Sequence, residues 1–437
     1  MQVGIASTMI TPERPVWLSG FGGREHPSEG KYNDLEAFAV VFDNGETRVG
    51  ILALDALSLT EYFIDRIREV GAELEIAPER MLINCSHTHC GPSFGVVKGA
   101  WELDKEYLAE TREKLCGLLR EAVDDLEESK LDYTVGVCTM GINRRRKDAE
   151  GKCAGMVPGP AEPMDMDVPV LRVLTPEGDM RAVVFSYACH PTTMGGYLIG
   201  TDYPGPAREL LREAIPGCTP IFLQGCGGDV KPRSVDPVTK RFGGATVETV
   251  YEIGHELARA VEAALCGEPE ELGQELDGAS IIAQLPMIGD PTEEQLAHYE
   301  AGNEYGRGWA AWVRKTLAEK GKLTDYAPME VQALRIGDVY LLGMSGEICV
   351  GVGLELKEKL PEVKLWTLGY SNLICTYFAS RGEHAAGGYE VTSSFIYYTL
   401  PDEPLPLGFQ PEAVDVVVDS GIELVRAIAE DKSRAGS

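Results

Sequence analysis

Residues 82–93 read LINCSHTHCGPS, an apolar run that ends in two histidines with one threonine between them. The run LINC predicts a buried strand. Because side chains two positions apart in an extended segment point to the same side, His87 and His89 can face one site. The chain holds only seven histidines, so a pair at one strand end indicates a metal centre if other segments supply further ligands. Taken alone, such a pair more often belongs to a polar loop.

Outward from this strand, apolar runs alternate with amphipathic helical patterns along most of the chain. Strands over 36–43 and 47–55 flank the turn NGE, and a helix near 60–75 follows them. Further strands are predicted over 168–174, 181–190, 218–225, 339–347 and 364–370, and further helices over 104–127, 203–215, 247–265, 292–320, 349–360 and 411–430. This alternation predicts an α/β fold in which mixed β-sheets are sandwiched with helices. No internal repeat or linker is visible, so residues 1–437 are expected to form a single large domain.

Three other segments place polar side chains where a strand ends. The segment VVFSYACHPTTMGG puts His190 directly after an apolar strand, and VYLLGMSGEICVG puts Glu347 after another. The Gly-rich segment 368–391 carries Tyr377 and Tyr389. Each has an ordinary alternative: a hydrogen-bonded core histidine, an acid in the first turn of a helix, or a surface loop. Together they lie at the carboxyl ends of strands, where α/β folds build their sites.

Two imidazoles and a carboxylate are a usual protein ligand set for a catalytic zinc ion, with one position left for water. Two of the histidines His87, His89 and His190 together with Glu347 could supply this set. Zinc lowers the pKa of a bound water toward ~7 and polarises a carbonyl group. Zn²⁺ is therefore the cofactor that the pattern favours, and hydrolysis of an amide or ester is the chemistry that it suits.

The composition excludes several other classes of protein. The chain has 69 acidic and 40 basic residues and a formal charge of −29, which disfavours nucleic acids and anionic membranes as partners. No run approaches the ~20 apolar residues of a membrane span, and the first residues lack a secretory pattern. Eleven cysteines without a CxxC pair are expected to be reduced thiols. We therefore expect a cytoplasmic protein with a small-molecule substrate, and a homo-oligomer stays open.

The motifs now become recognisable, because the chain resembles the catalytic domain of the neutral/alkaline (non-lysosomal) ceramidase family. SHTHCGP at 86–92 is similar to the family's SHTHSGP, and CHPTT at 189–193 to its HPT block. The remaining similar blocks, in family order from about residue 3 to about residue 400, include GINR (141–144), GDVKP (228–232), SGE (345–347) and GYE (388–390). The resemblance implies a single ceramidase-like catalytic domain of the short bacterial type.

The resemblance also implies roles for individual residues. Carried over position by position, the zinc ligands fall on His87, His190, Glu347 and Tyr377. His89 would lie beside the metal and stabilise the oxyanion. Arg144 and Tyr389 match positions that contact the amide or the polar head of the substrate, where donors aimed at the developing charge contribute several kcal/mol each.

The chain departs from the family at Lys231, where GDVKP replaces GDVSP and removes a serine hydroxyl. Lys231 is kept as a candidate catalytic and substrate-binding residue, which could bind a substrate carboxylate or phosphate. The alternative is an ion pair with Asp229. We also expect no C-terminal immunoglobulin-like domain and no export signal, unlike the full-length family members.

These departures make a bilayer lipid a poor substrate. We therefore expect a zinc-dependent hydrolase of an amide or ester bond in a small soluble substrate. A ceramidase-like lipid N-acyl amidase is the first alternative. The second, from another class, is a catalytically inactive homologue that binds a ligand.

Some neighbouring residues have weaker assignments. Asp55 could orient one of the histidines or be an ordinary acid at a strand end, and His26 lies on a Gly-rich loop that could line the mouth of the pocket. The cysteines that flank the histidines, Cys85, Cys90 and Cys189, are expected to be buried packing residues.

Overall fold

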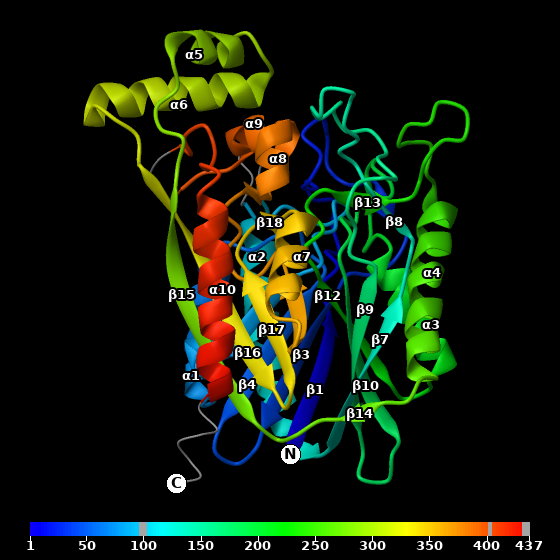
Figure 1. Cartoon of the computed structure of the whole chain (residues 1–437). Coiled ribbons are helices and arrows are strands. Elements are labelled where there is room, and N and C mark those ends of the chain that lie inside the picture. The colour runs from blue at the N-terminus through cyan, green and yellow to red at the C-terminus, as the bar shows by residue number, and fades with distance from the viewer. Residues whose placement is uncertain (96–102, 401–403, 431–437) are drawn as a thin grey trace.

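Three β-sheets form the frame of the molecule, and each sheet is built by the same succession of elements (Figure 1). The computed structural model describes residues 1–95, 103–400 and 404–430. In each unit three antiparallel strands are followed by a helix, a fourth strand parallel to the third, and a second helix. The spatial order of the strands is fourth, third, second, first in all three sheets.

The first and second units follow one another along the chain, and neither has a helix between its first two strands. Its main elements are β1 (Gln2–Met9), β3 (Glu36–Asp43), β4 (Arg48–Leu54), α1 (Glu61–Glu73), β5 (Met81–Cys85) and α2 (Lys105–Asp124). Those of the second unit are β7 (Lys130–Val137), β9 (Asp167–Leu174), β10 (Met180–Tyr187), α3 (Pro204–Ala214), β12 (Thr219–Gln224) and α4 (Val247–Leu265). The short strands β6 (Glu127–Glu128) and β14 (Glu270–Glu271) extend the edges of β1 and β7.

The third unit carries a helical insertion between its first two strands. Its main elements are β15 (Leu276–Pro286), β16 (Tyr326–Ile336), β17 (Val339–Met344), α7 (Val350–Lys359), β19 (Lys364–Leu368) and α10 (Ala413–Glu430). The insertion is the hairpin of α5 (Glu293–Glu300) and α6 (Glu304–Lys320), which projects at the top of the view in Figure 1.

The remaining elements are short, and several of them surround the candidate site. They are β2 (Gly30–Lys31), η1 (Pro78–Arg80), β8 (Gly141–Asn143), β11 (Leu198–Ile199), β13 (Val230–Pro232), β18 (Glu347–Ile348), β20 (Tyr377–Phe378), α8 (Arg381–Ala386), α9 (Tyr389–Thr392) and η2 (Ser394–Tyr397). Strands β8 and β13 pair antiparallel, and β18 and β20 pair parallel.

The inner faces of the three sheets meet in one apolar core. Phe42 of β3, Val184 of β10 and Trp366 of β19 are all buried in it. Each outer face is covered by the helix pair of its own unit, α1 with α2, α3 with α4, and α7 with α10. Burial of a large apolar side chain contributes about 1.5–3 kcal/mol, so this arrangement holds the three sheets together from inside and outside.

Each sheet contains one parallel strand pair, β4 with β5, β10 with β12, and β17 with β19. The carboxyl ends of these pairs lie at one end of the molecule. The segments that follow them carry the polar residues that the sequence singled out, so the expected convergence of strand ends is confirmed.

The α/β class and the mixed sheets are confirmed, and every strand and helix predicted above is present. The pattern at 292–320 corresponds to two helices, α5 and α6. Most of the short strands were not predicted, and four of the main strands of the three units were not predicted either. Three of these four, β1, β7 and β15, are the first strands of their units. They have exposed side chains, such as Val137 with 65% exposure, and therefore lack a continuous apolar run. In β16, Pro328 and several helix-forming residues mask the strand pattern.

No internal repeat was visible in the sequence, although the topology repeats three times. None of the helices within the described residues combines the length and the apolar character that a membrane crossing requires. The single-domain organisation, the cytoplasmic location and the oligomeric state stay predictions.

Candidate metal centre

The ring of His87 is fixed so that its Nε2 faces Glu347. His87 follows β5 with φ +65°, a left-handed conformation that is uncommon for non-glycine residues. Its backbone N–H donates to Ala56 O at 2.9 Å, and its Nδ1 donates to Leu57 O at 2.7 Å. Since a neutral imidazole carries one N–H, Nε2 is left as an acceptor. This is the tautomer that a metal ligand requires.

Glu347 faces this nitrogen from the third unit. Its Oε2 lies 3.1 Å from His87 Nε2 and 3.6 Å from His190 Nε2. Its backbone N–H donates to Thr376 O at 2.9 Å, and its Oε1 accepts the hydroxyl of Tyr398. The buried atoms His87 Nε2 and Glu347 Oε2 have no hydrogen-bond partner among the described residues. Two facing acceptors without a donor are satisfied by a cation between them.

His190 completes the group from the second unit. Its backbone N–H donates to Val230 O at 2.9 Å, and its Nδ1 lies 3.0 Å from the hydroxyl of Tyr370. Its Nε2 lies 3.1 Å from His89 Nε2. Burial, with repulsion from the nearby cations Arg144 and Lys231, lowers the pKa of both His89 and His190 well below the ordinary value. Both rings are therefore neutral, as metal ligands must be.

The donor set fits a divalent cation. The nitrogens of His87, His89 and His190 all lie within 4.8 Å of one another. Donor atoms about 2.0–2.2 Å from one tetrahedral zinc ion lie roughly 3.3 Å apart, which matches the 3.1 and 3.6 Å separations from Glu347 Oε2. Two imidazole nitrogens and a carboxylate oxygen are also the chemistry that zinc prefers. His87, His190 and Glu347 can therefore hold the ion, and His89 lies within reach of it.

Tyr377 lies beside this group. Strand β20 places Tyr377 opposite Glu347 in the parallel β18–β20 pair, and its ring is stacked on that of His190 with 6.2 Å between centroids and 1° between planes. Burial and the Glu347 carboxylate raise the pKa of Tyr377 well above its ordinary value. Whether its hydroxyl is a ligand stays a prediction.

Two tyrosines that sequence reasoning missed contact the ligand residues directly. Tyr370 bonds the Nδ1 of His190, and Tyr398 donates to Glu347. Tyr370 ends the predicted strand 364–370, so the strand-end rule that singled out His190 could have found it. Tyr398 follows a short 3₁₀-helix in an irregular segment and carries no such signal.

Arg144 approaches from the β8 side of the site. Its Nε donates to Glu390 Oε1 at 2.8 Å, and Arg145 donates to the other oxygen of the same carboxylate. Although burial acts to raise it, the two guanidinium groups hold the pKa of Glu390 below its usual value. Arg144 Nη2 is buried without a partner among the described residues. The ring of Tyr389 lies 5.9 Å from the Arg144 guanidinium and 5.3 Å from the Tyr377 ring.

The ion pair between Lys231 and Asp229, which the sequence left open, does not form. The Asp229 carboxylate accepts Asn143 Nδ2 at 2.8 Å and the backbone N–H of Val350 at 2.7 Å. Burial and Asp229 raise the pKa of Glu383 well above its ordinary value, so Glu383 is protonated and donates to Asp229. Asp229, Glu383 and Cys349 form a second group of candidate ligand atoms within 4.8 Å. The Asp229 carboxylate already accepts hydrogen bonds from Asn143, Val350 and Glu383, so it needs no ion to neutralise it.

Three weaker assignments have different outcomes. Asp55 pairs with Arg208, at 2.5 Å, and its carboxylate contacts no histidine among the described residues; the Leu57 carbonyl orients His87 in its place. His26 stacks on Tyr197 with 3.7 Å between centroids, whereas the loop that precedes it does line the pocket. All eleven cysteines, each within the described part of the chain, are free, and Cys85, Cys90 and Cys189 are buried.

A pocket of about 280 Å³ opens above the histidines. Its floor contains His87, His89 and Glu347, and the loop 20–23 with Tyr305 of α6 lies at its mouth. The hydroxyl of Tyr305 donates to Gly22 O at 3.3 Å, so the inserted hairpin closes one side of the pocket. The rest of the lining is aromatic or apolar and consists of Phe21, Leu57, Met156, Tyr377, Tyr389, Tyr397 and Tyr398.

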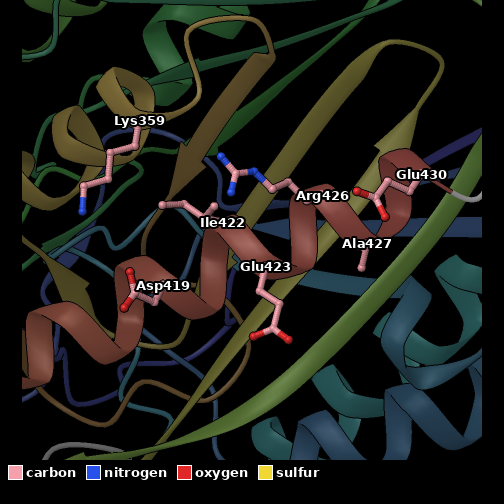
Figure 2. Close-up of a pocket in the computed structure, with 7 residues that line it drawn as sticks. All are labelled: Lys359, Asp419, Ile422, Glu423, Arg426, Ala427 and Glu430. Atoms are coloured by element: carbon pink, nitrogen blue, oxygen red, sulfur yellow. The ribbon is translucent and has the colours of Figure 1, made fainter.

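A larger hollow, of about 610 Å³, lies far from these groups along α10 (Figure 2). Charged side chains of that helix, including Asp419 and Arg426, line it, and Lys359 at the end of α7 completes the set. Its lining contains no histidine and no aromatic residue. The smaller pocket over the histidines is therefore the candidate site.

The sequence of this chain matches no family model and no curated protein. Its structure is similar to that of the neutral ceramidase from Pseudomonas aeruginosa, with a TM-score of 0.75 and 17% identity over 98% of this chain and 74% of that one. A ceramidase complexed with C2 matches with the same TM-score and identity, over 98% of this chain and 75% of its own. The chain therefore has the neutral ceramidase fold, as the resemblance of its motifs led us to expect.

Proposed function

From this shared fold, we propose that the chain is a relative of the neutral ceramidases and a zinc-dependent hydrolase of an amide bond in a small soluble substrate. One observation carries the proposal. His87 Nε2 and Glu347 Oε2 are buried, 3.1 Å apart and without a hydrogen-bond donor among the described residues, and both residues line the pocket. A buried arrangement of this kind is costly unless a cation satisfies it.

Zinc held by His87, His190 and Glu347, with Tyr377 as the further ligand that the resemblance implies, would lower the pKa of a water toward ~7 and polarise the substrate carbonyl. In the hydrolysis, water oxygen bonds to the carbonyl carbon, the C–N bond breaks, and the nitrogen leaves with a proton as an amine. An ester would react in the same way and release an alcohol.

The chain's own groups position the substrate and receive the developing charge. The neutral ring of His89 lies beside His190 and can donate to the carbonyl oxygen as it becomes negative. Tyr389 lines the pocket, and the Arg144 guanidinium lies 5.9 Å from its ring with Nη2 unpartnered among the described residues, so both residues can hold the amide. Removing one such donor typically costs about 100-fold or more in kcat. Because Lys231 replaces a serine, no protein hydroxyl is available at that position.

The size of the pocket favours a small substrate. Pockets for small molecules are typically about 300–1,000 Å³, and this one, at about 280 Å³, is at the lower end. Tyr305 and the loop 20–23 further restrict it. A long-chain lipid needs a longer trench than this.

A ceramidase-like lipid N-acyl amidase is the second candidate, favoured because the similar structures are ceramidases and because the pocket has an aromatic lining. Two assays separate the candidates. We expect hydrolysis of water-soluble N-acyl amides without detergent and little hydrolysis of short-chain fluorescent ceramides in detergent micelles. The opposite order of kcat/KM would favour the lipid amidase.

Metal content tests the proposal independently of any substrate. We expect about one zinc ion per chain by mass spectrometry of the purified protein, and loss of that ion in His87→Ala. His255→Ala, which changes a half-buried histidine of α4, is the matched control and should keep the ion. A content well below one ion per chain, even after zinc is added back, would sink the proposal.

A further inference from the structure

Lys231 is a cation without a protein counterion beside the candidate metal centre. It is half-buried on β13, and its Nζ lies 5.3 Å from the centroid of the Phe242 ring. It forms no ion pair or hydrogen bond with any residue that the structure describes. Since removing a charge from water is costly unless the charge is paired, a lysine in this position points to an anion from outside the chain.

The nearby carboxylates are already engaged. Both oxygens of Asp229 accept hydrogen bonds from Asn143 and Val350. Asp202 accepts bonds from Thr193 and from the backbone N–H of Tyr203. Neither acid therefore neutralises the lysine through a direct contact.

The pairing of β8 with β13 places Arg144 on the same face as Lys231. Lys231 is opposite Ile142, and Arg144 follows Ile142 by two positions, so the two cations are diagonal neighbours. The backbone is fixed here, because the N–H of Arg144 donates to Asp229 O at 2.8 Å and that of His190 to Val230 O at 2.9 Å. Burial and repulsion from the Arg144 charge lower the pKa of Lys231 to about 8. The two cations are therefore close enough to repel each other.

This wall is positive in a strongly acidic chain. Arg144 and Arg145 share the single carboxylate of Glu390, and Arg144 Nη2 has no hydrogen-bond partner in the described part of the chain. The charge of Lys231 also contributes to lowering the pKa of His89 and His190. The formal charge of the whole chain is −29. The three cations Arg144, Arg145 and Lys231 exceed the one carboxylate that pairs with them, in contrast to the negative charge of the whole chain. This local excess of positive charge favours an anionic ligand.

We propose that Lys231, together with the free Nη2 of Arg144, binds a carboxylate on the amine side of the scissile amide, so that the substrates are N-acylated amino acids. This inference rests on the proposed function and narrows its substrate class. A carboxylate on the carbon next to the amide nitrogen is small enough for the pocket and lies within a few bonds of the reacting carbonyl. It would give Lys231 a counterion, which no described residue supplies, and Arg144 Nη2 a hydrogen-bond acceptor.

A matched pair of substrates tests the inference. We expect the zinc-loaded full chain to release acetate from N-acetyl amino acids with a kcat/KM roughly 10–100-fold above that for the corresponding neutral carboxamides, the range for one charged hydrogen bond. Lys231→Met should reduce this ratio at least about tenfold, and Lys231→Arg should largely restore it. Lys315→Met, which removes an exposed lysine of α6, should leave the ratio at its wild-type value. Thermal melting establishes that each variant is folded.

The outcomes separate this inference from the proposed function. Hydrolysis of both series without a preference, or with a preference that survives in Lys231→Met, would overturn the carboxylate site and leave the hydrolase intact. If neither series reacts, calorimetric titration with N-acetylglycine decides: binding to the wild type that weakens in Lys231→Met supports the site, and equal binding or none overturns it. Tighter binding of inorganic phosphate than of N-acetylglycine would also overturn the carboxylate assignment.

Discussion

The tautomer of His87 shows how a single hydrogen bond prepares a residue for its role. The Leu57 carbonyl accepts a hydrogen bond from Nδ1 at 2.7 Å, so in the neutral ring the other nitrogen faces Glu347 as an acceptor. His190 is oriented in the same manner, through the hydroxyl of Tyr370. Partners of this kind typically change metal affinity 10- to 100-fold.

Tyr370→Phe isolates the contribution of this hydroxyl. The variant keeps the ring and removes the partner of His190 Nδ1, so we expect zinc affinity to fall about 10- to 100-fold, measured by competition with a chelator of known affinity. Tyr62→Phe, at an exposed tyrosine of α1, is the control. Unchanged zinc affinity in Tyr370→Phe would show that the hydroxyl does not orient the ring.

A substitution of Glu390 tests the contribution of the buried charges of Arg144 and Arg145 to stability. Glu390→Gln would leave the guanidinium groups of Arg144 and Arg145 without an anion, and breaking a buried pair by removing one partner costs about 3–5 kcal/mol. We therefore expect the free energy of unfolding, measured in urea, to fall by roughly that amount. Glu358→Gln, at an acid of α7 that faces solvent, should change it by less than about 0.5 kcal/mol.

At the scale of elements, α8 is held against the site by a protonated acid. Ser380 and Glu383 form a capping box at the start of α8, and Glu383 also donates to Asp229, which bonds the first residue of α7. This one carboxyl group therefore links the segments that carry Glu347, Arg144 and Tyr389.

The raised pKa of Glu383 makes this link sensitive to pH. Its contribution to stability is full below the unfolded pKa of about 4.3 and declines as pH rises toward and through the higher folded value. Glu383→Gln keeps a neutral donor, so its free energy of unfolding should decline less than that of the wild type between about pH 5 and pH 8. Urea unfolding of the metal-free proteins measures this. Glu252→Gln, an exposed control on α4, should follow the wild-type curve, and identical slopes for wild type and Glu383→Gln would contradict the assignment.

The inserted hairpin of α5 and α6 closes the pocket through Tyr305. Tyr305→Ala removes the ring that contacts the loop 20–23 at the pocket. If the substrate loses an apolar contact with this ring worth about 1.5 kcal/mol, KM for the smallest amides should rise roughly tenfold. We expect the penalty to be smaller for longer acyl chains, because the opened mouth admits them. Steady-state kinetics with a series of acyl lengths measures it, with Tyr326→Ala, at an exposed residue of β16, as the control. Equal effects at every length would show that Tyr305 does not limit size.

Elements with a continuous apolar run could be predicted from the sequence, and the others could not. Strands β5, β10 and β17 are buried on both faces, so their composition alone indicates a strand and the polar residue that follows stands out. Strands β1, β7 and β15 expose part of their length, and their mixed composition gives no such signal. The proposed ligands His87, His190 and Glu347 were therefore accessible to sequence reasoning, whereas Tyr398 and the Leu57 carbonyl depend on the packing of irregular segments.

For the whole molecule, the repeated topology means that the site belongs to no single unit. His87 comes from the first unit, His190 from the second and Glu347 from the third. The residues that fill the three units differ, so the repeat is one of topology and could not be recognised as a sequence pattern.

Metal binding should therefore stabilise the whole molecule. A ligand at about 1,000 times its Kd stabilises the folded state by about 4 kcal/mol. We expect calorimetric melting with zinc to occur several degrees above melting in the presence of a chelator, and this increment to disappear in His87→Ala. Equal melting temperatures with and without zinc would contradict a site that joins the three units.

The three parallel strand pairs have six carboxyl ends. The proposed ligands follow three of these ends, those of β5, β10 and β17. The end of β4 supplies a carbonyl and a salt bridge, that of β12 leads to Lys231, and that of β19 leads to Tyr370. A substitution at Lys231 can therefore change substrate specificity without changing any of the proposed metal ligands.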